Sequence, residues 1–376
     1  MINFMLSISQ KTIFIFSLGM VLGMVFVGLY PFNYSPSNQV SILRDGAGIR
    51  FFGRGEAVSI KDTVWPLADY SGQPITLEIR LKPARTYYRW IPHILSLCDR
   101  SGREVVYFGQ WKNHLIIRLM DDSHWVEKIK REIGSSEALI PGKHVLITFV
   151  LQKGSASLYI NGQLDRKFTG FDFETAISSH PIRSFILGNS PLGNSPWRGD
   201  VMYFSVFDKA LDPTVIQDHY QKLESGKVIN PDKEIIRYRF NEIAGRTILN
   251  EAGDNWELLI PEDLTPQRRK FLSLPSRQFF QTSLFYKDAA INLLGFMPLG
   301  FFLSMFVNRS FNQKHFRALA LATIVGGTLS LFIEVNQVFL VSRSSSATDL
   351  VLNILGTAAG ASVVILYSHF QELSPY

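Results

Sequence analysis

The sequence predicts a multidomain protein that joins an antiparallel β-sandwich, held outside the cytoplasm, to a four-helix transmembrane α bundle. Of its 376 residues, 46% are hydrophobic and 19% are charged, and the mean hydropathy of +0.09 lies between soluble and wholly membrane-embedded chains. Four long stretches almost free of charge can each span a hydrocarbon core of ~30 Å: Thr12–Phe32, Ala289–Val307, Ala318–Ile333 and Leu350–Tyr367. Between the first two, apolar and polar residues alternate with a period of two, which is typical of strands.

Composition excludes several classes of protein. The 29 phenylalanines and the single cysteine rule out collagen, a disordered chain and a disulfide scaffold. The formal charge of +6 raises the question whether the protein binds nucleic acid, a function that requires a basic face with interleaved aromatic residues. The nearest basic cluster, 268–270, precedes a predicted span and suits anionic headgroups instead, so we expect no nucleic-acid partner.

The charges beside the spans predict the topology. Thr12–Phe32 is longer than a usual signal-peptide core and has no small-x-small cleavage site, so we interpret residues 12–32 as a retained first transmembrane helix. The loop 308–317 carries Arg309, Lys314 and Arg317 without an acid, which places it in the cytoplasm. Both termini are then cytoplasmic, and the protein is a multi-pass protein of the cytoplasmic membrane.

Two pairs of glycines lie one helical turn apart within the spans, Gly19 with Gly23 and Gly356 with Gly360. Small residues at this spacing allow two helices to approach closely in lipid.

Residues 36–262 form the predicted extracytoplasmic domain. Ile75, Leu77, Ile79 and Leu81 alternate with polar residues, and the Asn161-Gly162 pair after a strand-like run predicts a hairpin turn. Proline and glycine separate the strands at a spacing that suits two packed sheets.

The strand motifs resemble the LamG-like or concanavalin A-like jelly roll. The similar runs are 75–83, 144–148 through 157–163, 187–189, 197–201 and 207–212. The resemblance implies that fold and, as in many members of the family, binding of glycan or protein. Hydrolysis is not expected, because the Glu-x-Asp-x-x-Glu strand of the related glucanases is absent.

Several features of this domain stay open in the sequence. The segment 237–260 resembles the strand and turn that usually open such a domain, and here it either completes the sandwich or pairs loosely near the membrane. Four aspartates in predicted loops either bind calcium or serve as turn residues: Asp45, Asp62, Asp121 and Asp122. No further cofactor is expected. Five tryptophans offer either sugar-stacking faces or core packing: Trp65, Trp90, Trp111, Trp125 and Trp197.

Polar residues recur on one face of each C-terminal span, within 286–370. The spacings of three and four put each set on one side of its helix, and alternating helix direction brings all the sets to the same outer level. Charged groups in spans are costly, so this placement predicts an outward-facing ligand site: Asp288, Asn292, Ser330, Glu334, Gln337, Arg343, Asp349 and Asn353.

A structural alternative makes Asp288 and Asp349 helix N-caps and pairs Glu334 with Arg343. It accounts less well for Asn292, Gln337 and Asn353, whose amides must also be satisfied within the spans. We therefore favour a functional site.

The same residues resemble the VanZ family of small bacterial membrane proteins. The motif runs Asp288-x₃-Asn292-x₃-Phe296-x-Pro298, then Ser330-x₃-Glu334-x₂-Gln337, then Arg343 to Asp349-x₃-Asn353. The resemblance implies a bacterial inner-membrane bundle interrupted after its first helix by the jelly roll. The founding member is linked to glycopeptide resistance and relatives occur near exopolysaccharide systems, although neither property follows from the motif.

The first functional hypothesis is therefore a non-enzymatic cell-envelope protein. Its bundle would hold an envelope lipid or lipid-linked saccharide, with Arg343 on phosphate or carboxylate, while the jelly roll binds glycan or protein. One alternative is a membrane enzyme that modifies such a lipid with Glu334 and Asp349 as acid or base, although no nucleophile or metal motif lies beside these acids. The other is a lectin or adhesion module on a membrane anchor. The sequence leaves the ligand, any metal and the oligomeric state open.

Overall fold

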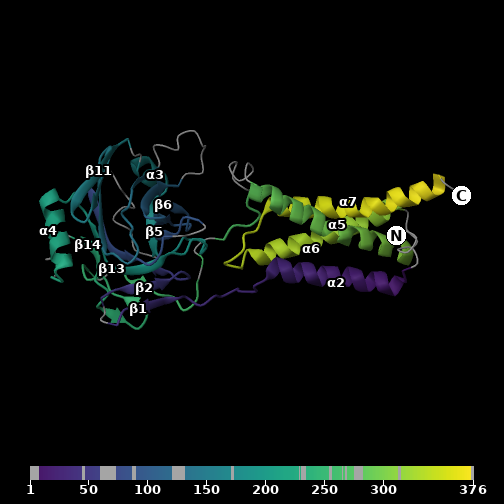
Figure 1. Cartoon of the computed structure of the whole chain (residues 1–376), viewed down its shortest axis with the longest axis horizontal. Coiled ribbons are helices and arrows are strands. Elements are labelled where there is room, and N and C mark those ends of the chain that lie inside the picture. Colours follow the sequence, from purple (N-terminus) through teal and green to yellow (C-terminus); the bar gives the residue numbers. More distant parts are fainter. Residues whose placement is uncertain are drawn as a thin grey trace. The chain divides into compact units, whose positions relative to one another are not determined.

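The chain folds into two compact units, one formed by Ser35–Arg268 and the other by Met1–Tyr34 together with Arg269–Tyr376 (Figure 1). The structure, a computed structural model, describes residues 8–44, 47–59, 73–86, 90–120, 132–170, 173–227, 229, 234–253, 256–264, 266, 269–274, 283–311 and 315–373.

The first unit is a sandwich of two antiparallel sheets, as the sequence predicts. One sheet runs in the spatial order β1 (Val40–Ile42), β2 (Ile49–Phe52), β13 (Arg198–Phe207), β4 (Ile75–Pro83), β9 (Val145–Gln152), β10 (Ser155–Ile160) and β11 (Gln163–Thr169), and β14 (Glu234–Tyr238) also pairs with β13. The other runs β15 (Ile243–Ala244), β16 (Thr247–Ile248), β17 (Leu258–Leu259), β3 (Ala57–Ser59), β12 (Ile182–Leu187), β5 (His93–Asp99), β6 (Glu104–Trp111), β7 (His114–Leu119) and β8 (Glu132–Ser135).

The alternating pattern of the sequence becomes the inner face of the first sheet. Leu77, Ile79 and Leu81 of β4 lie in the core, and Ile79 stands opposite Ile147 of β9. The hairpin between β10 and β11 turns at Asn161 and Gly162, whose φ angles of 52° and 79° are both positive. Asparagine and glycine accept this left-handed geometry most readily, which explains the turn at this pair.

Two short helices, α3 (Phe173–Ser179) and α4 (Pro213–Glu224), accompany the sheets. Helix α4 anchors to the back of the first sheet through a buried polar network. The Glu78 carboxylate accepts a hydrogen bond from the Thr148 hydroxyl at 2.9 Å and pairs with His219 of α4, also at 2.9 Å. Both side chains of the pair are almost fully buried, so each satisfies the other away from water.

The segment 237–260, for which the sequence left two alternatives, completes the sandwich. β14 pairs with β13 in the first sheet, and β17 pairs with β3 in the second, so the segment extends both layers. Tyr238, Phe240 and Trp256 lie in the hydrophobic core, and the Tyr238 hydroxyl donates a hydrogen bond to the Trp256 carbonyl. The sandwich is therefore completed by strands that lie after α4 in the chain.

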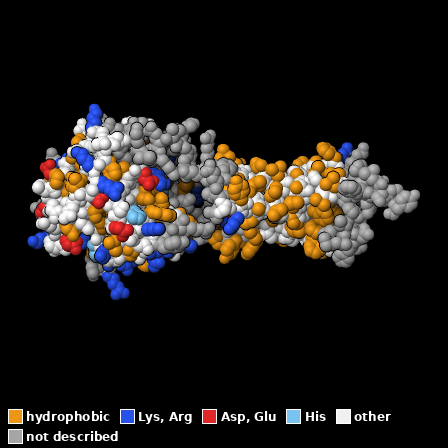
Figure 2. Space-filling model, turned by 45° about the horizontal axis from the view of Figure 1, so that its top comes forward, with side chains coloured by type: hydrophobic (Ala, Val, Ile, Leu, Met, Phe, Trp, Pro, Cys, Tyr) orange, Lys and Arg blue, Asp and Glu red, His pale blue; other side chains and the backbone are white. Residues whose placement is uncertain are grey.

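The second unit is a bundle of four helices: α2 (Gln10–Leu29), α5 (Ser283–Phe311), α6 (His315–Gln337) and α7 (Ala347–Leu373). Each is long and apolar enough to cross a membrane. Hydrophobic side chains cover the helices in Figure 2, whereas charged side chains are scattered over the sandwich. The chain is an integral membrane protein.

Helices α5 and α7 approach one another through glycine. A Cβ atom on Gly360 would lie 1.8 Å from the Met297 carbonyl oxygen, and one on Gly356 would lie 2.2 Å from the Leu293 carbonyl oxygen. Side chains cannot fit at these positions, so the second predicted glycine pair does form a helix contact. Around Gly19 and Gly23 of α2 there is no atom within 4 Å that an added Cβ would meet, among the residues the structure describes.

We expect Gly360→Ala to separate α5 from α7 and to lower the stability of the bundle by about 1–3 kcal/mol, because the added methyl group meets the backbone of α5. Thermal unfolding of the full chain in detergent, followed by helical circular dichroism, measures this. Gly19→Ala is the matched control and is expected to change stability little, since open space surrounds that glycine. Equal melting of the two variants would contradict the packing role.

A polar pocket in the helix bundle

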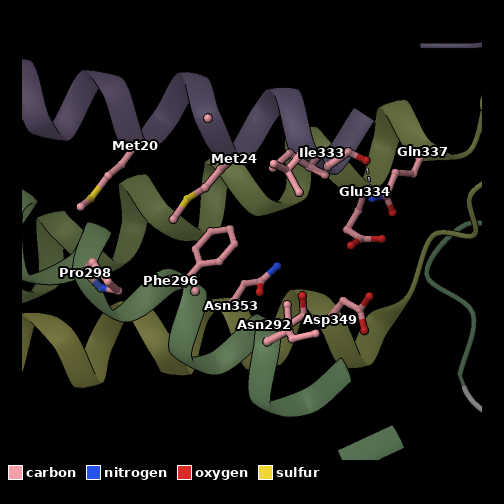
Figure 3. Close-up of a pocket in the computed structure, with 15 residues that line it drawn as sticks. Met20, Met24, Asn292, Phe296, Pro298, Ile333, Glu334, Gln337, Asp349 and Asn353 are labelled. Atoms are coloured by element: carbon pink, nitrogen blue, oxygen red, sulfur yellow. Dashed lines mark hydrogen bonds between the residues drawn. The ribbon is translucent and has the colours of Figure 1, made fainter. Parts of the chain in front are cut away.

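The bundle contains a pocket of about 380 Å³ lined by residues of all four helices. It lies at the end where α2 and α6 finish and α5 and α7 begin. Figure 3 shows Met20 and Met24 of α2 on one side, with Glu334 and Asp349 facing each other at one end. We call this cavity the bundle pocket.

Glu334 is the most buried acid of the bundle pocket, with 2% of its surface exposed. Its Oε2 atom accepts a hydrogen bond of 2.7 Å from the backbone N–H of Ser346, and the Ser345 hydroxyl also bonds the carboxylate. Ser345 is itself held by the segment before α5, since the backbone N–H of Ser273 donates to the Ser345 carbonyl at 3.0 Å. The carboxylate therefore fixes the connection between α6 and α7.

Asp349 lies in the first turn of α7, on the opposite side of the pocket from Glu334 (Figure 3). The Ser346 hydroxyl accepts a hydrogen bond of 3.3 Å from the Asp349 backbone N–H, so Ser346 is the N-cap and Asp349 occupies the third helical position. The Asn292 amide donates a hydrogen bond to the Asp349 carboxylate and joins α5 to α7. The interpretation of Asp349 as the N-cap is therefore wrong, because the N-cap is Ser346, three residues earlier in the chain.

Two further amides secure the pocket wall. The Asn353 Nδ2 atom donates a hydrogen bond of 2.9 Å to the Ser330 hydroxyl, and both residues are buried. The Asn353 Oδ1 atom is buried and has no hydrogen-bond partner among the described residues. The Gln337 Nε2 atom donates to the Gly28 carbonyl at 3.0 Å and thereby joins α6 to α2.

Arg343 and Asp288 lie differently from the expected arrangement. The exposed Arg343 guanidinium donates to the carbonyls of Val27 and Tyr30 at 3.0–3.1 Å, where it satisfies the C-terminal end of α2. Among the described residues no ion pair joins Arg343 to Glu334. Asp288 is exposed within α5, five residues after the helix begins, so it is not an N-cap and does not line the pocket.

Five of the eight predicted site residues therefore line one cavity: Asn292, Glu334, Gln337, Asp349 and Asn353. Ser330 supports Asn353 from behind. Sequence reasoning missed the apolar lining from α2 and the role of Ser346, although the Ser-x-x-Asp spacing before α7 is a recognisable capping pattern.

In the sandwich, the tryptophans separate into core and surface. Trp197 is completely buried and donates from Nε1 to the Gln110 side chain at 2.8 Å, so it is a core residue without a sugar-stacking face. Trp90 and Trp111 are 50% and 43% exposed.

The other aromatic and calcium candidates lie outside the described residues: Asp45, Asp62, Trp65, Asp121, Asp122 and Trp125. Within the described residues no group of three or more His, Cys, Asp or Glu could hold a metal ion.

Comparison with known proteins gives two family matches. Residues 52–217 match the concanavalin A-like lectin/glucanases superfamily, and residues 236–368 match VanZ/LLP1. The second match begins at β14, so it covers the last strands of the sandwich as well as helices α5 to α7. No curated protein matches the chain.

Solved structures resemble part of the chain at low identity. A provisionally named carbohydrate binding protein from Bacteroides ovatus is 12% identical, with a TM-score of 0.39 over 58% of this chain and 60% of that one. The receptor binding domain of a botulinum neurotoxin C/D mosaic serotype is 14% identical, with a TM-score of 0.37 over 50% and 44%. The chain thus spans about half the length of these structures.

Two parts of the chain thus match two different families. The protein is a membrane protein with a concanavalin A-like lectin/glucanase domain at residues 52–217 and a VanZ/LLP1 family region at residues 236–368.

Proposed function

We propose that this protein is a non-enzymatic component of the bacterial cell envelope whose bundle pocket holds the headgroup of an envelope lipid or lipid-linked saccharide. The observation that carries the proposal is the juxtaposition of a buried carboxylate, a second carboxylate and three amides within the transmembrane helices. Ionisable groups within a span are costly to bury, and their retention in a cavity marks a site.

The two halves of the pocket suit an amphiphilic molecule. Glu334, Asp349 and Asn353 supply polar contacts at one end, and Met20, Met24 and Phe296 supply an apolar wall (Figure 3). A volume of about 380 Å³ lies within the range of small-molecule sites and accommodates a headgroup or one sugar unit.

Binding is a better account of the pocket than catalysis. Its described lining carries acids and amides but no Ser, Cys, His or Lys side chain that would act as a nucleophile. The Glu334 carboxylate is moreover engaged by Ser346 and Ser345, which hold the α6–α7 connection in place.

We expect native mass spectrometry of the full chain in detergent to show a co-purifying envelope lipid or lipid-linked saccharide. Glu334→Gln keeps the size of the side chain but removes its charge, so the adduct should be lost or reduced about tenfold or more. Thr328→Val, on an exposed face of α6, should retain it. An adduct of equal intensity in wild type and Glu334→Gln would contradict a ligand in the pocket.

The charges of the loops support an orientation with the sandwich outside the cytoplasm. Arg309 and Arg317 flank the connection between α5 and α6, which the positive-inside rule places in the cytoplasm. The polar end of the bundle pocket then faces the outer leaflet of the inner membrane.

Cysteine accessibility tests this orientation. We expect Lys153→Cys, in the exposed turn between β9 and β10, to react with an impermeant maleimide in intact spheroplasts. Arg317→Cys should react only after permeabilisation. The native Cys98 is fully buried and gives little background. The reverse labelling pattern would overturn the proposed topology.

For the sandwich we propose carbohydrate binding, supported by its family match and by its exposed tryptophans. The Trp111 ring lies at the end of β6 and is 43% exposed, as a sugar-stacking ring must be.

We expect Trp111→Ala to weaken binding on a glycan array, with the full chain in detergent as probe, by about 1 kcal/mol or more. Phe52→Ala is the control, because Phe52 is an equally exposed aromatic residue on the other sheet. Undiminished binding by Trp111→Ala, or an equal loss in both variants, would exclude Trp111 as a sugar contact.

A further inference from the structure

We infer that the bundle pocket recognises a primary ammonium group, carried by a membrane lipid, rather than a phosphate or another anion. This inference rests on the proposed function, because it names the headgroup that the same pocket would take.

The first step is the uncompensated negative charge. Glu334 is 2% exposed, and its described partners are the Ser346 N–H and the Ser345 hydroxyl, which are neutral donors. Asp349 faces it across the cavity, where its described partners are the Asn292 amide and Ser346 (Figure 3). Two carboxylates in an apolar surrounding strongly favour a cationic ligand, since a buried charge without a counterion costs several kcal/mol.

The second step is the direction of the amides. Asn292 donates to Asp349, Asn353 donates to Ser330, and Gln337 donates to the Gly28 carbonyl, so each directs an N–H group to the protein. The buried Asn353 Oδ1 atom is left without a donor among the described residues. Together with the two carboxylates it offers acceptors from two helices, whereas an ammonium group supplies three N–H donors.

The third step concerns the nearest cation. Arg343 could neutralise the acids or hold a phosphate, but its guanidinium is bonded to the Val27 and Tyr30 carbonyls at the end of α2. None of the residues that line the described pocket is a lysine or an arginine. An anionic headgroup would therefore enter a cavity that offers it two negative charges and no cation.

The fourth step is size. A cavity of about 380 Å³ is more than ten times the ~30 Å³ share of one water molecule, so it is too large for a bare ion. The apolar wall formed by Met20, Met24 and Phe296 adjoins the acceptors and suits the hydrocarbon part of a lipid (Figure 3). A lipid that ends in a primary ammonium group satisfies both halves.

Native mass spectrometry with defined lipids tests the inference. The full chain in detergent is titrated with phosphatidylethanolamine, phosphatidylcholine and phosphatidylglycerol of identical acyl chains, and separately with ethanolamine. We expect phosphatidylethanolamine to bind about tenfold or more tightly than phosphatidylglycerol. Phosphatidylcholine should bind more weakly than phosphatidylethanolamine, because its quaternary ammonium has no N–H donor.

Variants link the preference to the pocket. Glu334→Gln and Asn353→Leu should each reduce the preference for phosphatidylethanolamine, because each removes one of the acceptors that would bind the ammonium group. Thr328→Val should leave the preference unchanged, since its hydroxyl bonds the Ile324 carbonyl on an exposed face of α6. Melting temperatures of all variants show which remain folded, and Asp349→Asn replaces Glu334→Gln if the latter does not fold.

The outcomes separate this inference from the proposed function. Binding of phosphatidylethanolamine without ethanolamine places the ammonium on a lipid, and binding of both shows that the ammonium alone suffices; each supports the inference. Equal or tighter Glu334-dependent binding of phosphatidylglycerol, or of a neutral lipid-linked sugar, overturns the ammonium inference but leaves the proposed function standing. A metal ion bound without lipid and lost in Glu334→Gln also overturns it. Lipid binding that no pocket variant changes overturns both.

Discussion

The close contact between α5 and α7 is the constraint on which the pocket depends. Gly356 and Gly360 bring the backbone of α7 against the carbonyls of Leu293 and Met297. At this separation the Asn292 amide reaches the Asp349 carboxylate. A lipid-filled gap between the helices would place both groups in hydrocarbon without partners, which is costly. Glycine therefore positions the polar side chains, although it contributes no polar atom itself.

Around that contact, side chains replace the missing backbone partners at the ends of the helices. Glu334 accepts the Ser346 N–H at the start of α7, Gln337 donates to the Gly28 carbonyl of α2, and Arg343 donates to the last carbonyls of the same helix. Helix termini have unsatisfied groups, and a membrane supplies little water to bond them. Together with the bond from Asn292 of α5 to Asp349 of α7, these contacts join all four helices, so the pocket is part of the bundle's framework.

The sequence was sufficient for the architecture, because its signals are periodic and local. Spans follow from hydropathy, strands from alternation, and the Asn161-Gly162 turn from backbone stereochemistry. The grouping of Asn292, Glu334, Gln337, Asp349 and Asn353 also followed from helical spacing.

The role of Arg343 did not follow from the sequence, because the carbonyls of Val27 and Tyr30 are more than 300 residues away in the chain. Nor did the position of Asp288 within α5, since this helix begins at Ser283, six residues before the apolar stretch that starts at Ala289. The burial of Trp197 depends on packing between sheets, which composition does not reveal.

The position of β14 affects how this protein is made and how it can be divided. The VanZ/LLP1 match starts at residue 236, yet β14 pairs with β13, and Tyr238 and Trp256 complete the sandwich core. A fragment that stopped at residue 217 would lack those side chains and leave one side of β13 unpaired along Phe204–Phe207. During synthesis the sandwich cannot close until about residue 260 has emerged, shortly before the first of the three C-terminal helices begins. The lectin-like domain is thus finished by residues that sequence comparison assigns to the membrane family, and a transferable module would have to end beyond β17.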